Sequence, residues 1–158
     1  MPEEFTTYLL ALEVVPMAVG QAFDQLPMHC TIMHRFHSAL SAADIAAAVA
    51  PIIAACEPIL LQPVSHQAFG PRKQLVTMTE PSFPLLDLHR KLYSKLNELG
   101  VQYTELDWVG DGYIPHVTDK QDKRLNIKKP TLSQAVYLIS VEHPLVGSKR
   151  FIESTLQF

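Results

Sequence analysis

The sequence contains few cysteines, no long apolar run and few charged residues, and each shortage argues against a class of protein. Cys30 and Cys56 form no CxxC motif, so we expect reduced thiols rather than a disulfide framework. The uncharged run at residues 45–56 covers 12 positions, short of the roughly 20 that a membrane-spanning helix needs. The start carries Glu3 and Glu4, where a signal peptide would be basic. We therefore expect a cytoplasmic protein without a membrane partner.

Charge is scarce and slightly negative. Charged residues make up 18% of the chain and the formal net charge is −3, whereas proteins that grip a long duplex nucleic acid usually present a basic face. A small nucleotide held by a few local groups fits this balance. The 158 residues are 47% hydrophobic, which excludes a disordered chain and predicts one domain over residues 1–158.

Apolar and β-branched residues between turn signals predict strands over much of the chain. Gly70 and Pro71 mark a turn between two of them. Residues 16–27 and 103–112 are expected to be connections. The predicted strands are residues 5–15, 28–36, 59–69, 74–79, 113–119, 132–142 and 149–157.

Two segments carry apolar residues at helical spacing. The first, residues 41–56, begins at the N-cap residue Ser41, and Pro51 inside it should kink or split the helix. The second begins at Ser82, carries a stripe of leucines and ends before Gly100. The order of strands and helices predicts an α+β fold with antiparallel sheets rather than a doubly wound parallel sheet.

Two tripeptides carry the chemistry: His29-Cys30-Thr31 and His116-Val117-Thr118. Each lies on a predicted strand, where residues two apart project from the same face. Each tripeptide therefore places an imidazole, which can give or take a proton near neutral pH, beside a hydroxyl that can donate to a phosphate oxygen. Two such pairs facing one another would suit hydrolysis of a phosphodiester without a metal.

With these motifs the chain resembles the 2H phosphoesterases, which include bacterial 2′-5′ RNA ligase-like proteins and 2′,3′-cyclic nucleotide phosphodiesterases. Residues 26–32 look like the first motif of that family, and residues 113–118, with Pro115 before His116, look like the second. The resemblance covers nearly the whole chain. It implies a bilobal α+β fold, in which two antiparallel β-sheets flank a central cleft, the helices lie outside and the two lobes are pseudo-symmetric.

The resemblance also implies the roles of residues. His29 and His116 would be the catalytic pair, one activating water and the other protonating the leaving ribose oxygen, and Thr31 and Thr118 would hold the phosphate oxygens. Which histidine is the acid stays open. No metal and no cofactor are expected. The implied substrate is a small nucleotide or RNA end with a 2′,3′-cyclic phosphate or a 2′-5′ linkage.

Further residues are candidates for contacts with the substrate. Aromatic rings could stack on a base, and Trp108 in its polar loop could act as a lid. Cations near the motifs could contact phosphate or ribose. These candidates are Tyr8, Phe69, Arg72, Trp108, Tyr113 and Lys120. The other histidines, His34, His37, His66, His89 and His143, are expected to be structural or solvated.

Two alternatives stay open beside this interpretation. One is a hydrolase of cyclic di- or oligonucleotide signals, which are also small phosphodiesters. The other is a nucleotide- or RNA-binding module that has lost turnover, although both His-x-Thr pairs are intact here. In each case we expect a monomer.

Overall fold

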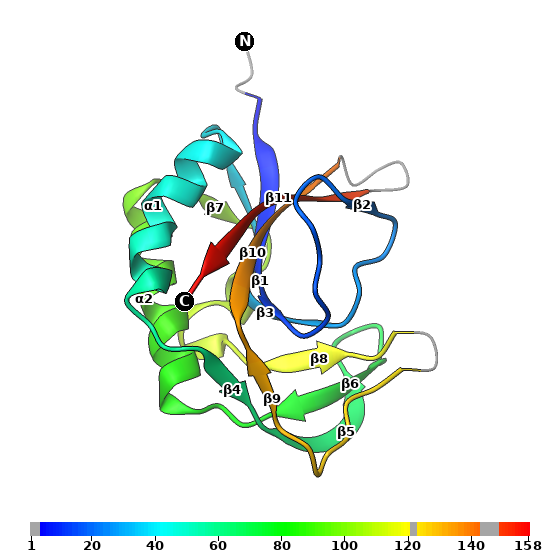
Figure 1. Ribbon diagram of the computed structural model, residues 1–158. Helices are drawn as coiled ribbons and strands as arrows, with labels where there is room; N and C mark the ends of the chain where they lie inside the picture. Colours follow the sequence, from blue (N-terminus) through cyan, green and yellow to red (C-terminus); the bar gives the residue numbers. More distant parts are fainter. Residues whose placement is uncertain (1–3, 121–122, 143–148) are drawn as a thin grey trace.

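The computed structural model describes residues 4–120, 123–142 and 149–158 of the chain (Figure 1). The predicted α+β class with antiparallel strands is confirmed. Two helices are present in the described residues, α1 (Ala42–Ala54) and α2 (Phe83–Glu98). The strands are β1 (Thr6–Glu13), β2 (Ala22–Phe23), β3 (His29–Ser38), β4 (Ile59–Leu61), β5 (Pro63–Phe69), β6 (Gln74–Thr79), β7 (Gln102–Tyr103), β8 (His116–Thr118), β9 (Thr131–Ser133), β10 (Ala135–Val141) and β11 (Arg150–Gln157).

One large sheet carries most of these strands. Its order is β2-β11-β10-β1-β3-β8-β6-β5, with β7 also on β3, while β4 and β9 form a separate pair. The joint between β3 and β8 is a single residue pair, Cys30 with Val117. The strands expected in two sheets are therefore hydrogen-bonded into one, and its narrowest point lies between the two His-x-Thr motifs.

Both helices pack on one face of the β1, β3, β10 and β11 part of the sheet (Figure 1). Leu88 and Leu92 of α2 and Val49 of α1 are fully buried there, beside Leu10 of β1 and Ile32 of β3. The side chain of Ser41 accepts a hydrogen bond from the Asp44 amide (3.1 Å), which satisfies one of the free amides at the start of α1.

The opposite face of this part of the sheet is covered by the connection that follows β1. Met17 and Leu26 of that connection pack against Leu9 of β1, Tyr137 of β10 and Ile152 of β11. Burying both faces explains why β10 is apolar at successive positions instead of alternating. The same connection ends at His29, so its packing also sets where the first motif begins.

Several predicted elements differ in extent from the observed ones. The predicted strands 59–69 and 132–142 are each divided, because β4 and β9 leave the large sheet to pair with each other. The predicted connections contain the short strand β2 and two short 3₁₀ turns, Leu106–Trp108 and Gly110–Gly112. Of the two effects predicted for Pro51, a kink or a split of the helix, the split is wrong, since α1 continues to Ala54. His143 lies outside the described residues.

Among the described residues, no helix is both long enough and apolar enough to cross a membrane.

Candidate active site at the β3–β8 joint

The pairing of β3 with β8 brings the two His-x-Thr motifs together. Cys30 and Val117, the middle residues of the motifs, face each other in an antiparallel pair and are buried in the core. Residues on either side of such a pair project from the opposite face of the sheet. His29 and Thr31 therefore share one face with His116 and Thr118, and all four side chains are partly exposed there.

The two imidazoles are anchored in the same way. Nδ1 of His29 lies 2.8 Å from the carbonyl oxygen of Pro27, and Nδ1 of His116 lies 2.9 Å from the carbonyl oxygen of Ile114. In both cases the acceptor is the residue two positions earlier, so each ring donates its Nδ1 hydrogen to the backbone. That bond fixes the ring and leaves Nε2 as the nitrogen that can serve a ligand.

Burial keeps both imidazoles neutral. It lowers the pKa of His29 to about 4, where the positive charges of Lys120 and Arg150 also disfavour a proton, although the Pro27 carbonyl favours one. Burial lowers the pKa of His116 as well, against the opposing effect of the Ile114 carbonyl. A neutral Nε2 can accept a proton from water, and a bound phosphate would raise both pKa values by its negative charge.

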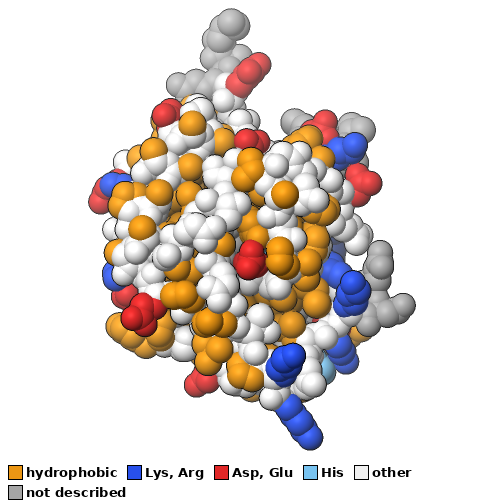
Figure 2. Space-filling model, viewed as in Figure 1, with side chains coloured by type: hydrophobic (Ala, Val, Ile, Leu, Met, Phe, Trp, Pro, Cys, Tyr) orange, Lys and Arg blue, Asp and Glu red, His pale blue; other side chains and the backbone are white. Residues whose placement is uncertain are grey.

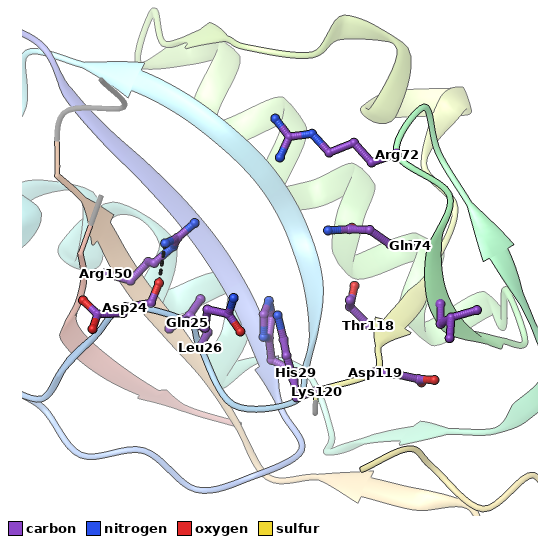
Figure 3. A pocket seen from close by; sticks show the side chains of 11 residues that line it. Asp24, Gln25, Leu26, His29, Arg72, Gln74, Thr118, Asp119, Lys120 and Arg150 are labelled. Carbon is purple, nitrogen blue, oxygen red and sulfur yellow. Dashed lines mark hydrogen bonds between the residues drawn. The ribbon is translucent and has the colours of Figure 1, made fainter. Parts of the chain in front are cut away.

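A cavity of about 610 Å³ opens beside His29 and Thr118 (Figure 3). Arg72 and Gln74 extend into it from the β6 side, while Lys120 and Arg150 approach from the side of His29. Burial, together with nearby Arg150, lowers the pKa of Lys120. The space-filling view shows basic side chains gathered at the lower right, where Figure 1 places β5, β6 and β8 (Figure 2).

Two acidic residues, Asp119 and Asp24, lie at the edge of this cavity. Asp119 accepts hydrogen bonds from Nε and Nη2 of Arg124 at 3.0 and 2.8 Å, and its side chain points away from the cavity centre (Figure 3). Asp24 offers its backbone oxygen to Nη1 of Arg150 at 2.6 Å. The three cations that line the cavity, Arg72, Lys120 and Arg150, outnumber these two carboxylates, so the balance of charge is positive, which suits an anion.

A second cavity, of about 370 Å³, is lined by His116. Phe69 packs on the His116 ring with 4.6 Å between centroids and meets Trp108 edge-on at 4.8 Å. His34 completes the aromatic wall, with its ring 5.5 Å from Trp108 and 6.2 Å from His116. Arg72 and Gln74 line both cavities, so the two adjoin and together form the cleft of the site.

His34 lies in this cleft because β3 is irregular. The register with β1 shifts twice between the pairs Tyr8–Phe36 and Ala11–Thr31, so β3 gains two residues over its partner. Such bulges break the alternation of faces and re-aim side chains. Sequence reasoning, which assumed regular alternation, assigned His34 a structural or solvated place; the bulge has no clear signal in the sequence.

The structure places two of the candidate aromatic residues away from the cleft. Tyr8 is buried against Phe36, and its hydroxyl donates to the Leu40 carbonyl oxygen at 2.8 Å, so it cannot stack on a ligand base. Tyr113 is also buried, and its hydroxyl donates to the Thr31 carbonyl oxygen at 2.8 Å. Tyr113 therefore supports the first motif from beneath instead of facing the cleft.

His89 of α2 ties three parts of the site together. Its Nδ1 lies 2.7 Å from the carbonyl oxygen of Ile32, and its Nε2 accepts a hydrogen bond from the amide of Gly110 at 2.9 Å. Its ring stacks on Tyr113 with centroids 4.1 Å apart and planes 7° apart. The buried imidazole, neutral because burial lowers its pKa, thus links α2 to β3 and to the loop that carries Trp108.

That loop depends on two glycines. Gly110 has φ +65°, and a Cβ there would lie 2.9 Å from Cε2 of Tyr93. A Cβ on Gly112 would lie only 2.0 Å from the backbone oxygen of Asp107. Side chains at these positions would push the loop outward, so the place of Trp108 beside Phe69 is set by backbone packing.

In the described part of the chain, no group of three or more His, Cys, Asp or Glu side chains is placed to hold a metal ion. The other two histidines expected to be structural are engaged elsewhere: His37 contacts Thr7 and Thr104, and Nε2 of His66 bonds to the Leu125 carbonyl oxygen.

The fold is similar to that of solved phosphoesterase structures. E. coli LigT complexed with NADP+ matches with a TM-score of 0.60 and 13% identity, covering 98% of each chain. A structure described as a phosphoesterase matches with a TM-score of 0.62 and 13% identity over 97% of this chain and 98% of the other. E. coli LigT complexed with 3′-AMP matches with a TM-score of 0.58 and 14% identity over 98% and 99%.

The sequence itself matches the family model of the 2′-5′ RNA ligase superfamily over residues 17–145. The chain belongs to this superfamily, which confirms its resemblance to the 2H phosphoesterases. Membership supports phosphodiesterase-type activity. None of the curated proteins compared with the chain matches it in sequence.

The lowered pKa values make stability depend on pH. The unfolded chain takes up protons on histidine near pH 6.5, whereas folded His29 and His34 take them up only near pH 4. The free energy of unfolding should therefore fall as the pH drops from 6.5 to 5, by up to about 1.4 kcal/mol per pH unit for each such imidazole. Urea unfolding at several pH values should show a shallower slope in His34→Gln, and an unchanged slope would contradict this account.

Replacing His89 with Phe should keep the stacking on Tyr113 and remove both hydrogen bonds. Leaving the buried Ile32 carbonyl and Gly110 amide without a partner should cost about 1–3 kcal/mol of unfolding free energy. Because Trp108 is the sole tryptophan, its fluorescence should also change as its loop loses this anchor. Arg90→Ala, on the same helix but exposed, serves as the control. Unaltered emission in His89→Phe would show that His89 does not hold the loop.

Proposed function

We propose that this protein hydrolyses a phosphodiester of a small nucleotide or RNA end, either a 2′,3′-cyclic phosphate or a 2′-5′ linkage, by acid–base catalysis. The observation that carries the proposal is the Cys30–Val117 pair, which puts His29, Thr31, His116 and Thr118 on one face. Two imidazoles and two hydroxyls on that face match the needs of a single phosphate: one base, one acid and two donors to its oxygens.

In this proposal one imidazole takes a proton from water through Nε2 as the water oxygen attacks phosphorus. The other, protonated at Nε2, gives its proton to the leaving ribose oxygen as the P–O bond breaks. Thr31 and Thr118 donate to the non-bridging oxygens, whose charge grows in the transition state. Arg72 and Lys120 add positive charge at the cavity beside Thr118, which favours binding of the anion.

The substrate class rests on the shape of the cleft and on the relatives. The cationic cavity suits phosphate, and the aromatic wall of Phe69 and Trp108 suits the face of a base, which stacks on aromatic side chains. E. coli LigT, whose fold is similar, is solved in complexes with NADP+, 3′-AMP and ATP. We carry nucleotide binding to this chain as part of the proposal.

Replacing either histidine of the pair should abolish most of the activity. His29→Ala and His116→Ala should each lower the rate of hydrolysis by on the order of 10²–10⁴-fold, because each removes one proton-transfer step. The assay is hydrolysis of nucleoside 2′,3′-cyclic phosphates, 2′-5′-linked dinucleotides and 3′,5′-linked cyclic dinucleotides, with and without EDTA. His66→Ala, outside the cleft, is the matched control.

Activity of the unmodified protein should survive EDTA. Full activity of both histidine variants would overturn the proposal. Turnover of 3′,5′-linked cyclic dinucleotides alone would favour a signal hydrolase instead, and tight nucleotide binding without turnover of any substrate would favour a binding module.

The pH profile should be bell-shaped and shifted to acid. The pH dependence of kcat/KM reports the ionisations of the free enzyme's base and acid. Since burial lowers the pKa of His29 to about 4 and also lowers that of His116, the maximum of kcat/KM should lie below pH 6.5. Steady-state assays in constant-ionic-strength buffers check this, and a maximum at alkaline pH would exclude this pair as the titrating groups.

A further inference from the structure

The first cavity is larger and more cationic than the proposed hydrolysis needs. Its volume of about 610 Å³ lies within the roughly 300–1,000 Å³ of pockets that hold whole small molecules. The reacting phosphate of a cyclic phosphodiester carries one negative charge, and two imidazoles and two hydroxyls already serve its oxygens. Three cations, Arg72, Lys120 and Arg150, line the same cavity, so their charge exceeds that of one phosphodiester.

Arg150 and Lys120 come from distant parts of the chain and meet on one side of this cavity (Figure 3). Arg150 is the first residue of β11 and pairs with Val141 of β10 and Phe23 of β2, so its backbone is fixed within the sheet. Its Nη1 donates to the Asp24 carbonyl oxygen at 2.6 Å, which orients the guanidinium. Since a guanidinium has five N–H donors, it can hold this carbonyl and a phosphate oxygen together.

Lys120 is also fixed at its backbone. Its amide donates to the Lys123 carbonyl oxygen at 3.1 Å, and its carbonyl oxygen accepts from the Lys123 amide at 2.9 Å. The side chain is partly buried, and burial together with Arg150 lowers its pKa. The charges of both cations also act on His29, so they lie close to the proposed phosphate position. Like charges held together in a partly buried place cost folding stability, and an anion between them removes that cost.

The lining of this cavity favours a phosphate over a base. None of the described lining residues is Phe, Tyr or Trp, and the amides of Gln25 and Gln74 stand beside the cations. A ribose that carries the reacting phosphate at its 2′ and 3′ oxygens and the base at C1′ has its 5′ oxygen left for a further group. A phosphate there is separated from the reacting phosphate by one sugar, so one cavity of this volume can hold both.

We propose that Lys120 and Arg150 bind a second phosphate, carried on the 5′ oxygen of the ribose whose 2′,3′-cyclic phosphate reacts. This inference rests on the proposed function for the position of the reacting phosphate. It narrows the substrate from any small cyclic phosphodiester to one with a phosphate on both sides of the ribose. The second phosphate is either the 5′-monophosphate of a nucleotide or the last internucleotide phosphate of an RNA end, and the test separates these two sources.

The test compares substrates with and without the second charge. The value of kcat/KM is measured for adenosine 2′,3′-cyclic phosphate, for the same compound with a 5′-phosphate, and for the diadenosine dinucleotide that ends in a 2′,3′-cyclic phosphate. A second dinucleotide with a neutral methylphosphonate linkage keeps the size and removes the charge. A 5′-phosphate or a charged linkage should raise kcat/KM by about 10-fold or more, the gain expected of one charge-assisted hydrogen bond.

Each pattern of kcat/KM has one meaning. A gain from the 5′-phosphate identifies a mononucleotide substrate, and a gain of the charged dinucleotide over the neutral one identifies an RNA end; either gain supports the second-phosphate site. Equal kcat/KM for all the substrates overturns it, even where hydrolysis is confirmed. A gain that both dinucleotides share and the 5′-phosphate lacks shows that size is recognised instead of charge, and it also overturns the inference.

Variants locate the site. The ratio of kcat/KM with the second phosphate to kcat/KM without it is measured within one preparation, so any misfolded fraction cancels. Arg150→Gln and Lys120→Gln should each lower this ratio about 10-fold, and Arg150→Lys, which keeps the charge, should preserve part of it. Lys149→Gln removes an exposed neighbouring cation outside the cavity lining and should leave the ratio unchanged. A ratio that both other Gln variants retain overturns the assignment.

Failure of the proposed hydrolysis would be seen separately. If none of the cyclic phosphates is turned over, calorimetry compares the binding of adenosine 3′,5′-bisphosphate with that of adenosine 3′-monophosphate. Tighter binding of the bisphosphate that Arg150→Gln removes supports the second-phosphate site without any catalysis. Equal Kd values of the two ligands for the unmodified protein overturn it.

Discussion

The Cys30–Val117 pair is the contact on which the site depends. It is the sole residue pair between β3 and β8, and it decides that four polar side chains share one surface. Both middle residues are buried in the core. Hydrophobic packing therefore stabilises the contact between β3 and β8, which a single residue pair would stabilise only weakly. Tyr113 and His89 reinforce it by bonding the carbonyl oxygens of Thr31 and Ile32 on the core side.

The electrostatics of the cleft favour an anion. Burial keeps His29, His34 and His116 neutral, and it also lowers the pKa of Lys120 and Arg35. Partial burial of these cations beside neutral imidazoles costs folding stability. An anion in the cleft relieves this cost, so binding energy and the proton affinity of the imidazoles rise together.

The class of fold, the strand β6 and the placement of each His-x-Thr motif on a strand could be predicted from the sequence, since these follow from local periodicity and turn residues. It could not predict what arises from long-range pairing. The division of residues 59–69 into β4 and β5 results from a partner strand, β9, far along the chain. Tyr8 and Tyr113 were candidates because aromatic rings suit both a core and a base, and composition does not distinguish these environments. Arg150 joins the cavity from the last strand, with no motif to mark it.

The two extra residues of β3 mean that the number of residues in this strand, as well as their identity, encodes the cleft. Side chains of a regular strand alternate between the two faces of the sheet, and His29 and Thr31 follow one such alternation. His34 follows the opposite one, because the register shifts between Thr31 and His34. Loss of a single residue in that stretch would turn the side chains beyond it to the opposite face of the sheet, even with both His-x-Thr motifs retained. Relatives compared position by position across β3 would then align residues that face opposite sides of the sheet, so insertions and deletions there carry information about which side chains face the cleft that substitutions do not.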